Sequence, residues 1–325
     1  MVDKATNELL DAIEFCVLAN NASPDIAYTS YCCLSAETGT VYMSDGIVSC
    51  GCLCHVEITT SIEVKKLLKA LKAAKSGYTF TILDNSSIAL KSGRLKAVIP
   101  TIDYIADKLY PDPILHSENV ETFIRALTVA SAVTKDKASH IVNASVLVYN
   151  TSCYGTDTQL LIEYWHGIPI STELTIPKTF IAALSKIKKL PVGIGYSKKS
   201  LTVWFNDRSW IRTQLYENSW PVENVLDLFK PTSTYLPIHT ELGQALEELS
   251  AFVGIDGRIL LSDNHISSSN KSSYDIDVYV QDVACNCKLL QIVCKYATGW
   301  DVSSRIDRHI AFVGENLRGL LCIMV

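Results

Sequence analysis

The stretch Val64-Lys65-Lys66-Leu67-Leu68-Lys69-Ala70-Leu71 begins a pattern that the chain repeats twice more. A turn at Ser76-Gly77 and two extended runs, 78–83 and 88–99, follow this helix-like segment. The same order, a helix and then extended runs, returns over 177–216 and over 285–324. A repeat of roughly 110 residues is far longer than the ~20–50 residues of solenoid repeats. The pattern therefore predicts three similar domains in a row, each with its own core.

Each third also begins with an amphipathic helix, because apolar residues recur there at steps of three and four. These helices are expected near Leu9 to Val17, Val120 to Val133 and Leu242 to Val253, and strand-like text follows each of them. The predicted fold class is α+β, with two helices per domain packed on antiparallel sheets. Stretches 110–117 and 230–239, rich in Pro, Asp, Ser and Thr, are the expected linkers. They place the domains at 1–114, 115–232 and a shorter 233–325.

The composition is that of a folded protein with substantial cores. Hydrophobic residues make up 48% of the 325 residues, charged residues 19%, and the mean hydropathy is +0.18. The formal net charge of -5 argues against a simple basic nucleic-acid binder. We expect a cytoplasmic protein that does not enter a membrane, since no apolar run approaches the ~18–20 residues of a membrane span and the polar first residues do not resemble a secretory signal.

Lysine residues lie on the outward faces of the second helices. Helical projection places Val64, Leu67, Leu68 and Leu71 on one stripe of the first copy, with the lysines opposite or on the flanks. The equivalent lysines of all three copies are Lys65, Lys66, Lys69, Lys72, Lys178, Lys186, Lys189, Lys288 and Lys295. A single lysine-rich helix usually indicates no more than a solvated face. Three such helices in an acidic protein favour a surface that attracts phosphates.

Two further segments give the chain a resemblance to a known family. Residues 91–100, Lys-Ser-Gly-Arg-Leu-Lys-Ala-Val-Ile-Pro, resemble the closing strand of the first domain of the bacterial-type DNA polymerase III beta sliding clamp. Residues 175–178, and the segment 213–221 with its closing Trp220-Pro221, resemble the second domain of that family. The likeness covers nearly the whole chain as an order of elements. It is typical of a divergent member, of the kind that phages encode.

The resemblance implies a non-enzymatic processivity factor without a cofactor or a metal. Three tandem clamp domains would form a ring by head-to-tail dimerisation, with the first domain of one subunit pairing with the third domain of the next. The ring would encircle double-stranded DNA without sequence preference and tether the replicative polymerase; a clamp loader is a further implied partner. For a phage-encoded protein the compartment would be the host cytoplasm.

The family also implies a pocket for short partner peptides between the second and third domains. The matching residues are Leu160, Leu161, Val225, Leu226, Ile323 and Met324. A core role for these residues is the alternative. The chain differs from the family pattern ATDGHRLA, because residues 156–161 read Thr-Asp-Thr-Gln-Leu-Leu, and it lacks a Met-Pro tail.

Other readings of the sequence remain open. Cys50, Cys52, Cys54 and His55 form a local cluster that could bind metal, although structural zinc sites prefer Cys-x2–4-Cys spacing. The carboxylates Asp256, Asp263, Asp275 and Asp277 would serve a metal-dependent nuclease. The alternatives to a clamp are therefore a metal- or cysteine-dependent nucleic-acid enzyme and a repeat-built assembly protein that does not bind DNA.

Overall fold

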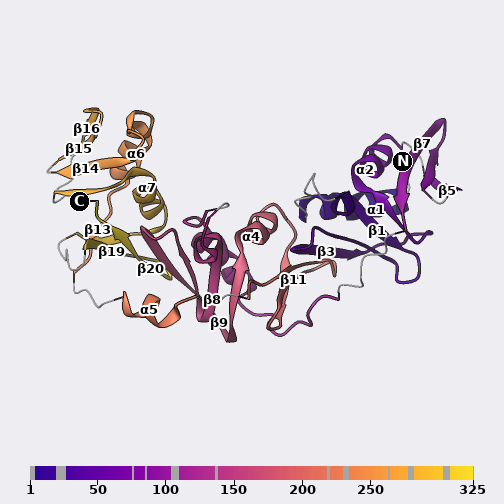
Figure 1. The fold of residues 1–325 in the computed structure, drawn as a ribbon, viewed down its shortest axis with the longest axis horizontal. Coiled ribbons are helices and arrows are strands. Elements are labelled where there is room, and N and C mark those ends of the chain that lie inside the picture. The colour runs from indigo at the N-terminus through magenta and orange to yellow at the C-terminus, as the bar shows by residue number, and fades with distance from the viewer. Residues whose placement is uncertain are drawn as a thin grey trace. The chain divides into compact units, whose positions relative to one another are not determined.

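The computed structural model describes residues 4–19, 27–74, 77–84, 86–103, 110–135, 138–217, 220–229, 234–262, 264–276, 282–302 and 308–324. The chain divides into two compact units (Figure 1). The first comprises Met1–Val120 and Thr179–Leu215, and the second comprises Glu121–Lys178 and Tyr216–Val325. None of the described helices is both long and apolar enough to cross a membrane.

The first unit is built on one antiparallel sheet. Its helices are α1 (Lys4–Ala19), η1 (Ala27–Ser30), α2 (Val64–Ala73) and α4 (Lys178–Leu184), the last beginning at the unit boundary. Its strands are β1 (Tyr31–Ser35), β2 (Thr40–Ser44), β3 (Val48–Leu53), β4 (Thr60–Glu63), β5 (Thr79–Asp84), β6 (Ser87–Ser92), β7 (Leu95–Ile102), β10 (Pro191–Tyr196), β11 (Ser200–Phe205) and β12 (Trp210–Gln214). Among the described residues, these ten strands lie in the order β10-β11-β12-β3-β2-β1-β4-β7-β6-β5.

The second unit contains two sheets. Its helices are α3 (Val120–Ser131), η2 (Ile141–Ala144), α5 (Val222–Asp227), α6 (Thr240–Leu249), η3 (Ser250–Phe252) and α7 (Cys287–Tyr296). Its strands are β8 (Ser145–Thr156), β9 (Leu160–Pro177), β13 (Leu236–Pro237), β14 (Arg258–Ser262), β15 (His265–Ser268), β16 (Ser273–Asp275), β17 (Val283–Asn286), β18 (Gly299–Asp301), β19 (His309–Gly314) and β20 (Leu317–Cys322). In the part of the chain that is described, one sheet runs β13-β18-β19-β20-β9-β8 and the other β16-β15-β14-β17.

The internal repeat is present, with one more strand per copy than the sequence indicated. α2, α4 and α7 are each followed by an antiparallel three-strand meander: β5-β6-β7, β10-β11-β12 and β18-β19-β20. The last extended run of each copy splits into two strands at a turn. Gly93, Arg208 and Asn316 have positive φ angles of 58°, 64° and 54° at these turns, so the chain reverses where a continuous strand was expected.

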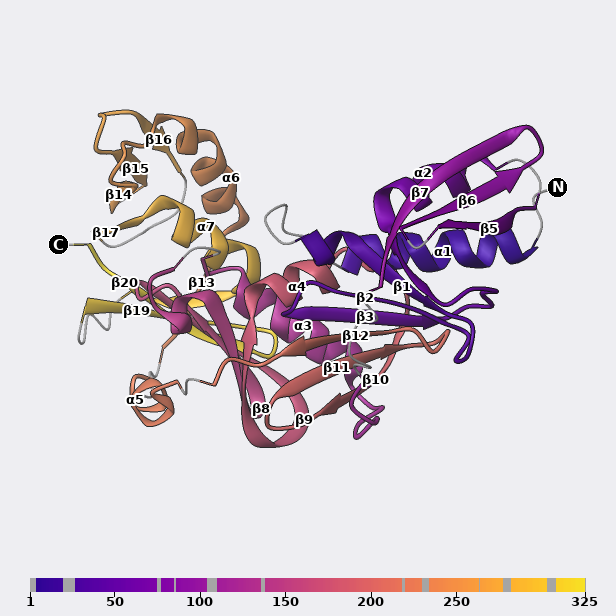
Figure 2. The same cartoon turned by 45° about the vertical axis from the view of Figure 1, so that its right-hand side comes forward.

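The two helices of the first third pack on the sheet as predicted, and they also contact each other. α1 lies along β2 and β3 and beside α2 (Figure 2). Leu9, Ile13 and Cys16 of α1 are fully buried against this sheet, at 0% exposure. Burying each such aliphatic side chain contributes about 1.5–3 kcal/mol, so the stripe that the sequence shows is what holds the helix to the sheet.

The strand pairing crosses both predicted domain junctions. β12 pairs with β3, and β20 pairs with β9. The first predicted linker is also tied to a sheet: Asp112 accepts hydrogen bonds from the Ser200 and Thr202 hydroxyls at 2.9 and 2.8 Å. This stretch lacks hydrophobic periodicity because its contacts are polar, not because it is unattached. The boundaries near 114 and 232 stay predictions, and residues 230–233 of the second linker lie outside the described residues.

Candidate nucleic-acid interface and partner site

α2 presents its lysines to solvent. Val64, Leu67 and Leu71 are buried, whereas all four lysines of the helix are exposed, namely Lys65, Lys66, Lys69 and Lys72. Lys66 Nζ lies 3.0 Å from Glu63 Oε2, and Lys72 Nζ lies 2.8 Å from Glu14 Oε1. Exposed ion pairs of this kind contribute little free energy and exchange readily for other anions. The helix can therefore offer a cluster of cations to a polyanion.

Two of the lysines near α4 make contacts within the protein. α4 ends at Leu184, so Lys186 and Lys189 lie beyond the helix that the sequence predicted over 177–189. Lys178 Nζ donates a 2.6 Å hydrogen bond to the Thr134 carbonyl. Lys189 Nζ lies 2.6 Å from Asp207 Oδ2 and 4.2 Å from the centre of the Phe15 ring. These contacts hold Lys178 and Lys189 in place within the protein.

The third helix of the set, α7, lies beside α6 (Figure 1). The two helices line a groove. Lys288 and Lys295 are exposed, while Leu289, Leu290 and Val293 are buried. The groove has a volume of about 440 Å³, and both lysines and Glu247 line it. Asn286 caps the helix, its side chain accepting from the backbone N–H groups of Lys288 and Leu289 at 3.1 and 3.3 Å.

α2 and α7 thus share a chemistry suited to phosphate. Lysine ammonium groups on flexible stems contact phosphate oxygens without reading bases, so such contacts are independent of sequence. α2 and α7 show the predicted arrangement, an apolar stripe on the core and lysines outside, in the clearest form. The ion-pair partners Glu14 and Asp207 come from distant segments, which helical periodicity alone does not reveal.

A second candidate site is a cluster of apolar side chains in the second unit, here called the partner cluster. Its buried members are Leu147, Tyr154, Leu161, Trp220 and Val225, and Val142, Tyr149, Val222, Leu226, Phe229 and Leu320 pack against them. The Trp220 indole N–H donates to the Ser145 hydroxyl at 3.2 Å. Strands β8, β9 and β20 supply one side of the partner cluster, and the segment from Trp220 through α5 to Phe229 supplies the other.

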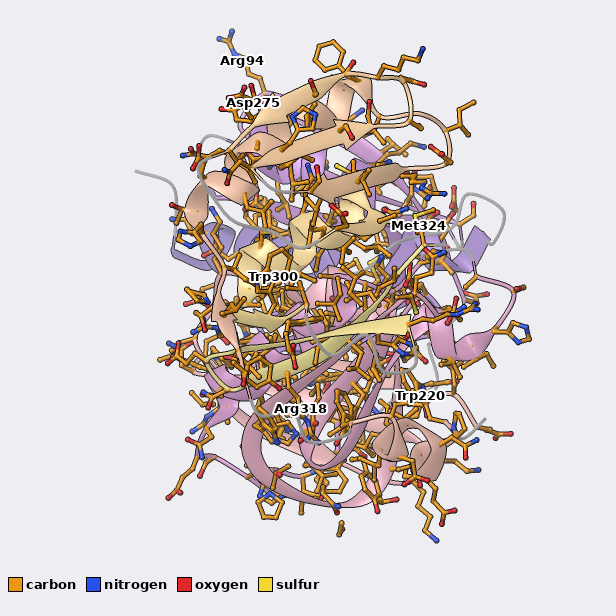
Figure 3. All side chains as sticks on the ribbon, turned by 90° about the vertical axis from the view of Figure 1, so that its left-hand side faces the viewer. Arg94, Trp220, Asp275, Trp300, Arg318 and Met324 are labelled. Atoms are coloured by element: carbon orange, nitrogen blue, oxygen red, sulfur yellow. The ribbon has the colours of Figure 1, made fainter. Side chains whose placement is uncertain are left out.

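An ion pair borders the partner cluster. The Arg318 Nε lies 2.5 Å from Glu163 Oε2, and the Tyr154 hydroxyl donates to Glu163 Oε1 at 2.7 Å. The Arg318 guanidinium also lies 4.3 Å from the centre of the Phe229 ring and 5.5 Å from that of Trp165. Burial and the hydrogen bond to Glu163 raise the pKa of Tyr154. Figure 3 shows Arg318 and Trp220 at the same end of this unit, away from Asp275.

The structure brings together some of the predicted pocket residues. Leu161, Val225 and Leu226 belong to the partner cluster. Leu160 is fully buried and, as the neighbour of Leu161 in β9, points to the other face of the sheet. At the tail, Ile323 and Met324 are half-buried; Met324 N–H donates to the Ala284 carbonyl at 2.8 Å, and Leu320 is the β20 residue in the cluster.

Sequence reasoning missed Arg318, Glu163 and Phe229. The aromatic–proline pair Trp220-Pro221 was the signal that could have located this region, since it marks where the chain leaves the second third. Arg318 and Glu163 are 155 positions apart, and the register of β20 on β9 is what brings them together.

The cysteine residues are buried thiols. All eleven are unpaired, and nine of them are buried. The Cys50 and Cys52 thiols lie 3.9 and 3.7 Å from the carbonyls of Cys16 and Ala12 in α1. Burial raises the pKa of Cys54 and of Cys294 to about 12, which disfavours the nucleophilic thiolate.

The described residues contain no group of three His, Cys, Asp or Glu side chains that could hold a metal ion. Asp256 and Asp275 are exposed there, whereas Asp263 and Asp277 lie outside the described residues.

Comparison with known proteins identifies the fold. No protein-family model and no curated protein matches the sequence. The structure is similar to the sliding clamp (DNA polymerase III subunit beta) from Pseudomonas aeruginosa solved with griselimycin, with a TM-score of 0.77, 13% identity and 98% of each chain covered. It is also similar to the Helicobacter pylori beta clamp bound to a DNA ligase peptide, with a TM-score of 0.75, 13% identity and 99% of each chain covered. The predicted α+β clamp fold is therefore confirmed.

Proposed function

We propose that this chain, which has the fold of the bacterial beta clamps, is a DNA sliding clamp. Two copies would close into a ring around duplex DNA and tether a replicative polymerase. The observation that carries the proposal is a clamp fold over 98% of the chain combined with exposed lysines on α2 and α7. Such a protein acts where the replication machinery acts, in the cytoplasm, or in the host cytoplasm if a phage encodes it.

DNA retention would come from topology supported by loose charge contacts. The whole chain has a net charge of -5, so the lysine-bearing helices stand out against an acidic body. Repulsion of phosphate elsewhere and attraction along these helices would keep the duplex inside the ring and leave it able to slide. No bond is made or broken by the clamp itself.

The partner cluster is the surface that we assign to the polymerase and to a clamp loader. The Helicobacter pylori clamp was solved with a DNA ligase peptide, so proteins of this fold can take a short peptide. In this chain an apolar cluster bordered by an aromatic side chain and a guanidinium would hold a hydrophobic anchor. Tethering by a short peptide gives the polymerase a high effective concentration at the primer end.

The chain's own strand junctions suggest how two copies would pair. In the second unit, Tyr154, Glu163 and Arg318 face one another across β8, β9 and β20. Counting from the turns that precede β9 and β16, Asp275 is the equivalent of Glu163, and His265 pairs with it as Tyr154 does with Glu163. His265 Nδ1 lies 2.8 Å from Asp275 Oδ1.

The equivalent of Arg318 in the first unit is Lys96. Arg318 lies opposite Val313 in the β19-β20 hairpin, and Lys96 lies opposite Lys91 in the β6-β7 hairpin. We therefore expect Lys96 of one copy to face Asp275 of the second copy when β7 pairs with β16. Lys91 and Lys96 lie on the β7 side of this contact, and Asp275 and His265 lie on the β16 side. The two strand edges therefore carry opposite charge at neutral pH.

The test is retention on circular DNA. A ring should stay on a nicked plasmid in about 0.5 M salt, where contacts between exposed charges are largely screened, and should be lost when the plasmid is cut to a linear form. At about 0.1 M salt, where phosphate contacts still contribute, Lys65→Glu/Lys69→Glu should reduce retention on the nicked circle roughly tenfold, since each lost phosphate contact weakens association. Lys198→Glu/Lys199→Glu, which changes the same charge on the exposed β10-β11 turn, should retain as the unmodified protein does.

Equal loss from circular and linear DNA would contradict a topological clamp. A protein that binds neither form, yet assembles, would instead be the assembly protein considered from the sequence.

A further inference from the structure

The first unit contains a pocket that the proposed function does not use. It has a volume of about 160 Å³ and is lined by residues of β2, β3 and β12. These three strands are adjacent in the sheet (Figure 2). Its aromatic and aliphatic wall comes from Val41, Tyr42, Tyr110, Pro111 and Trp210. The volume is below the ~300–1,000 Å³ of pockets for drug-sized ligands, so it suits a single anchoring side chain better than a cofactor.

A glycine makes room for the pocket floor. Tyr42, Gly51 and Trp210 are direct neighbours across β2, β3 and β12. A Cβ atom at Gly51 would come within 2.7 Å of the Trp210 ring, so glycine allows the indole to lie flat on β3. Together these side chains form a preformed aromatic surface with a recess in the middle.

Hydroxyl groups form the polar side of the pocket. The Thr38 hydroxyl donates to the Ser35 hydroxyl at 2.9 Å and lies 2.6 Å from the Thr40 hydroxyl. All three residues line the pocket. Such groups can hydrogen-bond the backbone of a bound peptide while its side chain enters the apolar recess.

The linker that closes the pocket is fixed in position. The Ser200 and Thr202 hydroxyls of β11 donate to the Asp112 carboxylate. The Trp204 indole donates to the Asp112 carbonyl at 2.8 Å, and Arg212 Nε lies 3.6 Å from Asp112 Oδ2. These contacts hold Pro111 against the sheet, and Tyr110 is 73% exposed at the rim. The wall is therefore present before any ligand arrives, which lowers the entropic cost of binding.

The pocket is the counterpart, in the chain's internal repeat, of the partner cluster. The row Tyr42-Gly51-Trp210 corresponds to the row Tyr154-Glu163-Arg318, each crossing from one third of the chain to the next. The linker residues correspond as well, since an aromatic–proline pair follows each last strand: Tyr110-Pro111 and Trp220-Pro221. The partner cluster is bordered by the ion pair of Arg318 and Glu163, whereas the pocket has Gly51 and an open recess at the equivalent place.

We infer that this pocket is a second peptide-docking site, which takes a leucine or aromatic anchor of a short, extended partner segment. The inference rests on the proposed function for the class of ligand, because it assigns to the first junction the role proposed for the second. One subunit would then hold two partner segments, one at this pocket and one at the partner cluster.

The experiment is a titration of the full-length protein, labelled with 5-fluorotryptophan, with a synthetic Leu-Asp-Leu-Phe peptide, which has the sequence of residues 226–229 and offers both a leucine and an aromatic anchor. The chain has five tryptophans, so ¹⁹F NMR gives a small set of resonances, which Trp210→Phe and Trp220→Phe assign. We expect the Trp210 resonance to shift in a saturable way and to keep doing so in Leu226→Asp, a change confined to the partner cluster. Tyr110→Ala should weaken this response roughly tenfold, the loss of one aromatic anchor contact.

The matched control is Phe252→Ala, which removes an aromatic side chain that is 58% exposed elsewhere. It should leave the Trp210 response unchanged. A Trp210 resonance that stays still while Trp220 saturates would overturn the inference, as would a Trp210 shift that disappears in Leu226→Asp. If neither resonance moves, the inference is also overturned, while retention on circular DNA still decides whether the protein is a clamp.

Discussion

At the scale of single residues, Arg318 contacts both the sheet, through Glu163 of β9, and the partner cluster, through Phe229. Its guanidinium bonds to a Glu163 carboxylate whose side chain is 3% exposed, and it lies over the Phe229 ring. A carboxylate with so little access to water depends on its partner, so removing one charge costs more than removing both.

Arg318→Leu should therefore lower the free energy of unfolding by about 3 kcal/mol, the lower end of the range for a broken buried pair, since the arginine itself is 36% exposed. Glu163→Leu/Arg318→Leu should recover most of that loss in denaturant titrations. If the single variant is as stable as the unmodified protein, the ion pair does not hold β20 to β9.

The buried thiols predict a sensitivity to alkaline pH. Burial raises the pKa of Cys54 and Cys294 from 9.0 to about 12, and that of Cys153 well above 9.0. A raised pKa in the folded state means that the unfolded chain loses these protons first. Stability is thus fully present below about pH 9 and is lost between about 9 and 12, at about 1.4 kcal/mol per pH unit for each such thiol.

Guanidinium unfolding at pH 8 and pH 10.5 checks this expectation. Cys153→Ala, which removes one fully buried thiol, should make the loss between these pH values smaller. A midpoint that does not move with pH would show that the thiols ionise equally in both states.

At the scale of elements, α7 depends on one cap. The Asn286 side chain accepts from two backbone N–H groups of the first turn, and the helix buries Leu289, Leu290 and Val293 below the exposed lysines. Asn286→Ala should cost about 1 kcal/mol in thermal or denaturant unfolding, whereas Asn286→Asp should cost less because a carboxylate also caps. Equal stability of the alanine variant would mean that packing alone sets the start of the helix.

The elements also show what local sequence can and cannot predict. The stripes of α2 and α7 follow from a 3.6-residue period, which is written within ten residues, and they are buried as predicted except for Leu68, which is half-buried at the edge of the α2 stripe. The turn that divides β19 from β20 depends on Asn316 at positive φ, a single residue that hydrophobic patterning does not detect. The partner cluster depends on the register of β20 on β9, so Leu161 and Val225 were found while Arg318 and Phe229 were not.

At the scale of the whole molecule, ring closure gives a prediction that the proposed register makes specific. If β7 of one copy pairs with β16 of the other, Lys96→Asp places a carboxylate opposite Asp275, and Asp275→Lys places a lysine opposite Lys96. Each single variant should weaken the dimer by about 1–2 kcal/mol, or roughly tenfold in dissociation constant, because like charges face each other across a strand pair. The double variant restores opposite charges and should recover the dimer.

Sedimentation of the three variants measures this, with Lys198→Glu as a charge control remote from β7 and β16 in the sequence. Singles that dimerise normally, or a double variant weaker than either, would place the contact between copies elsewhere.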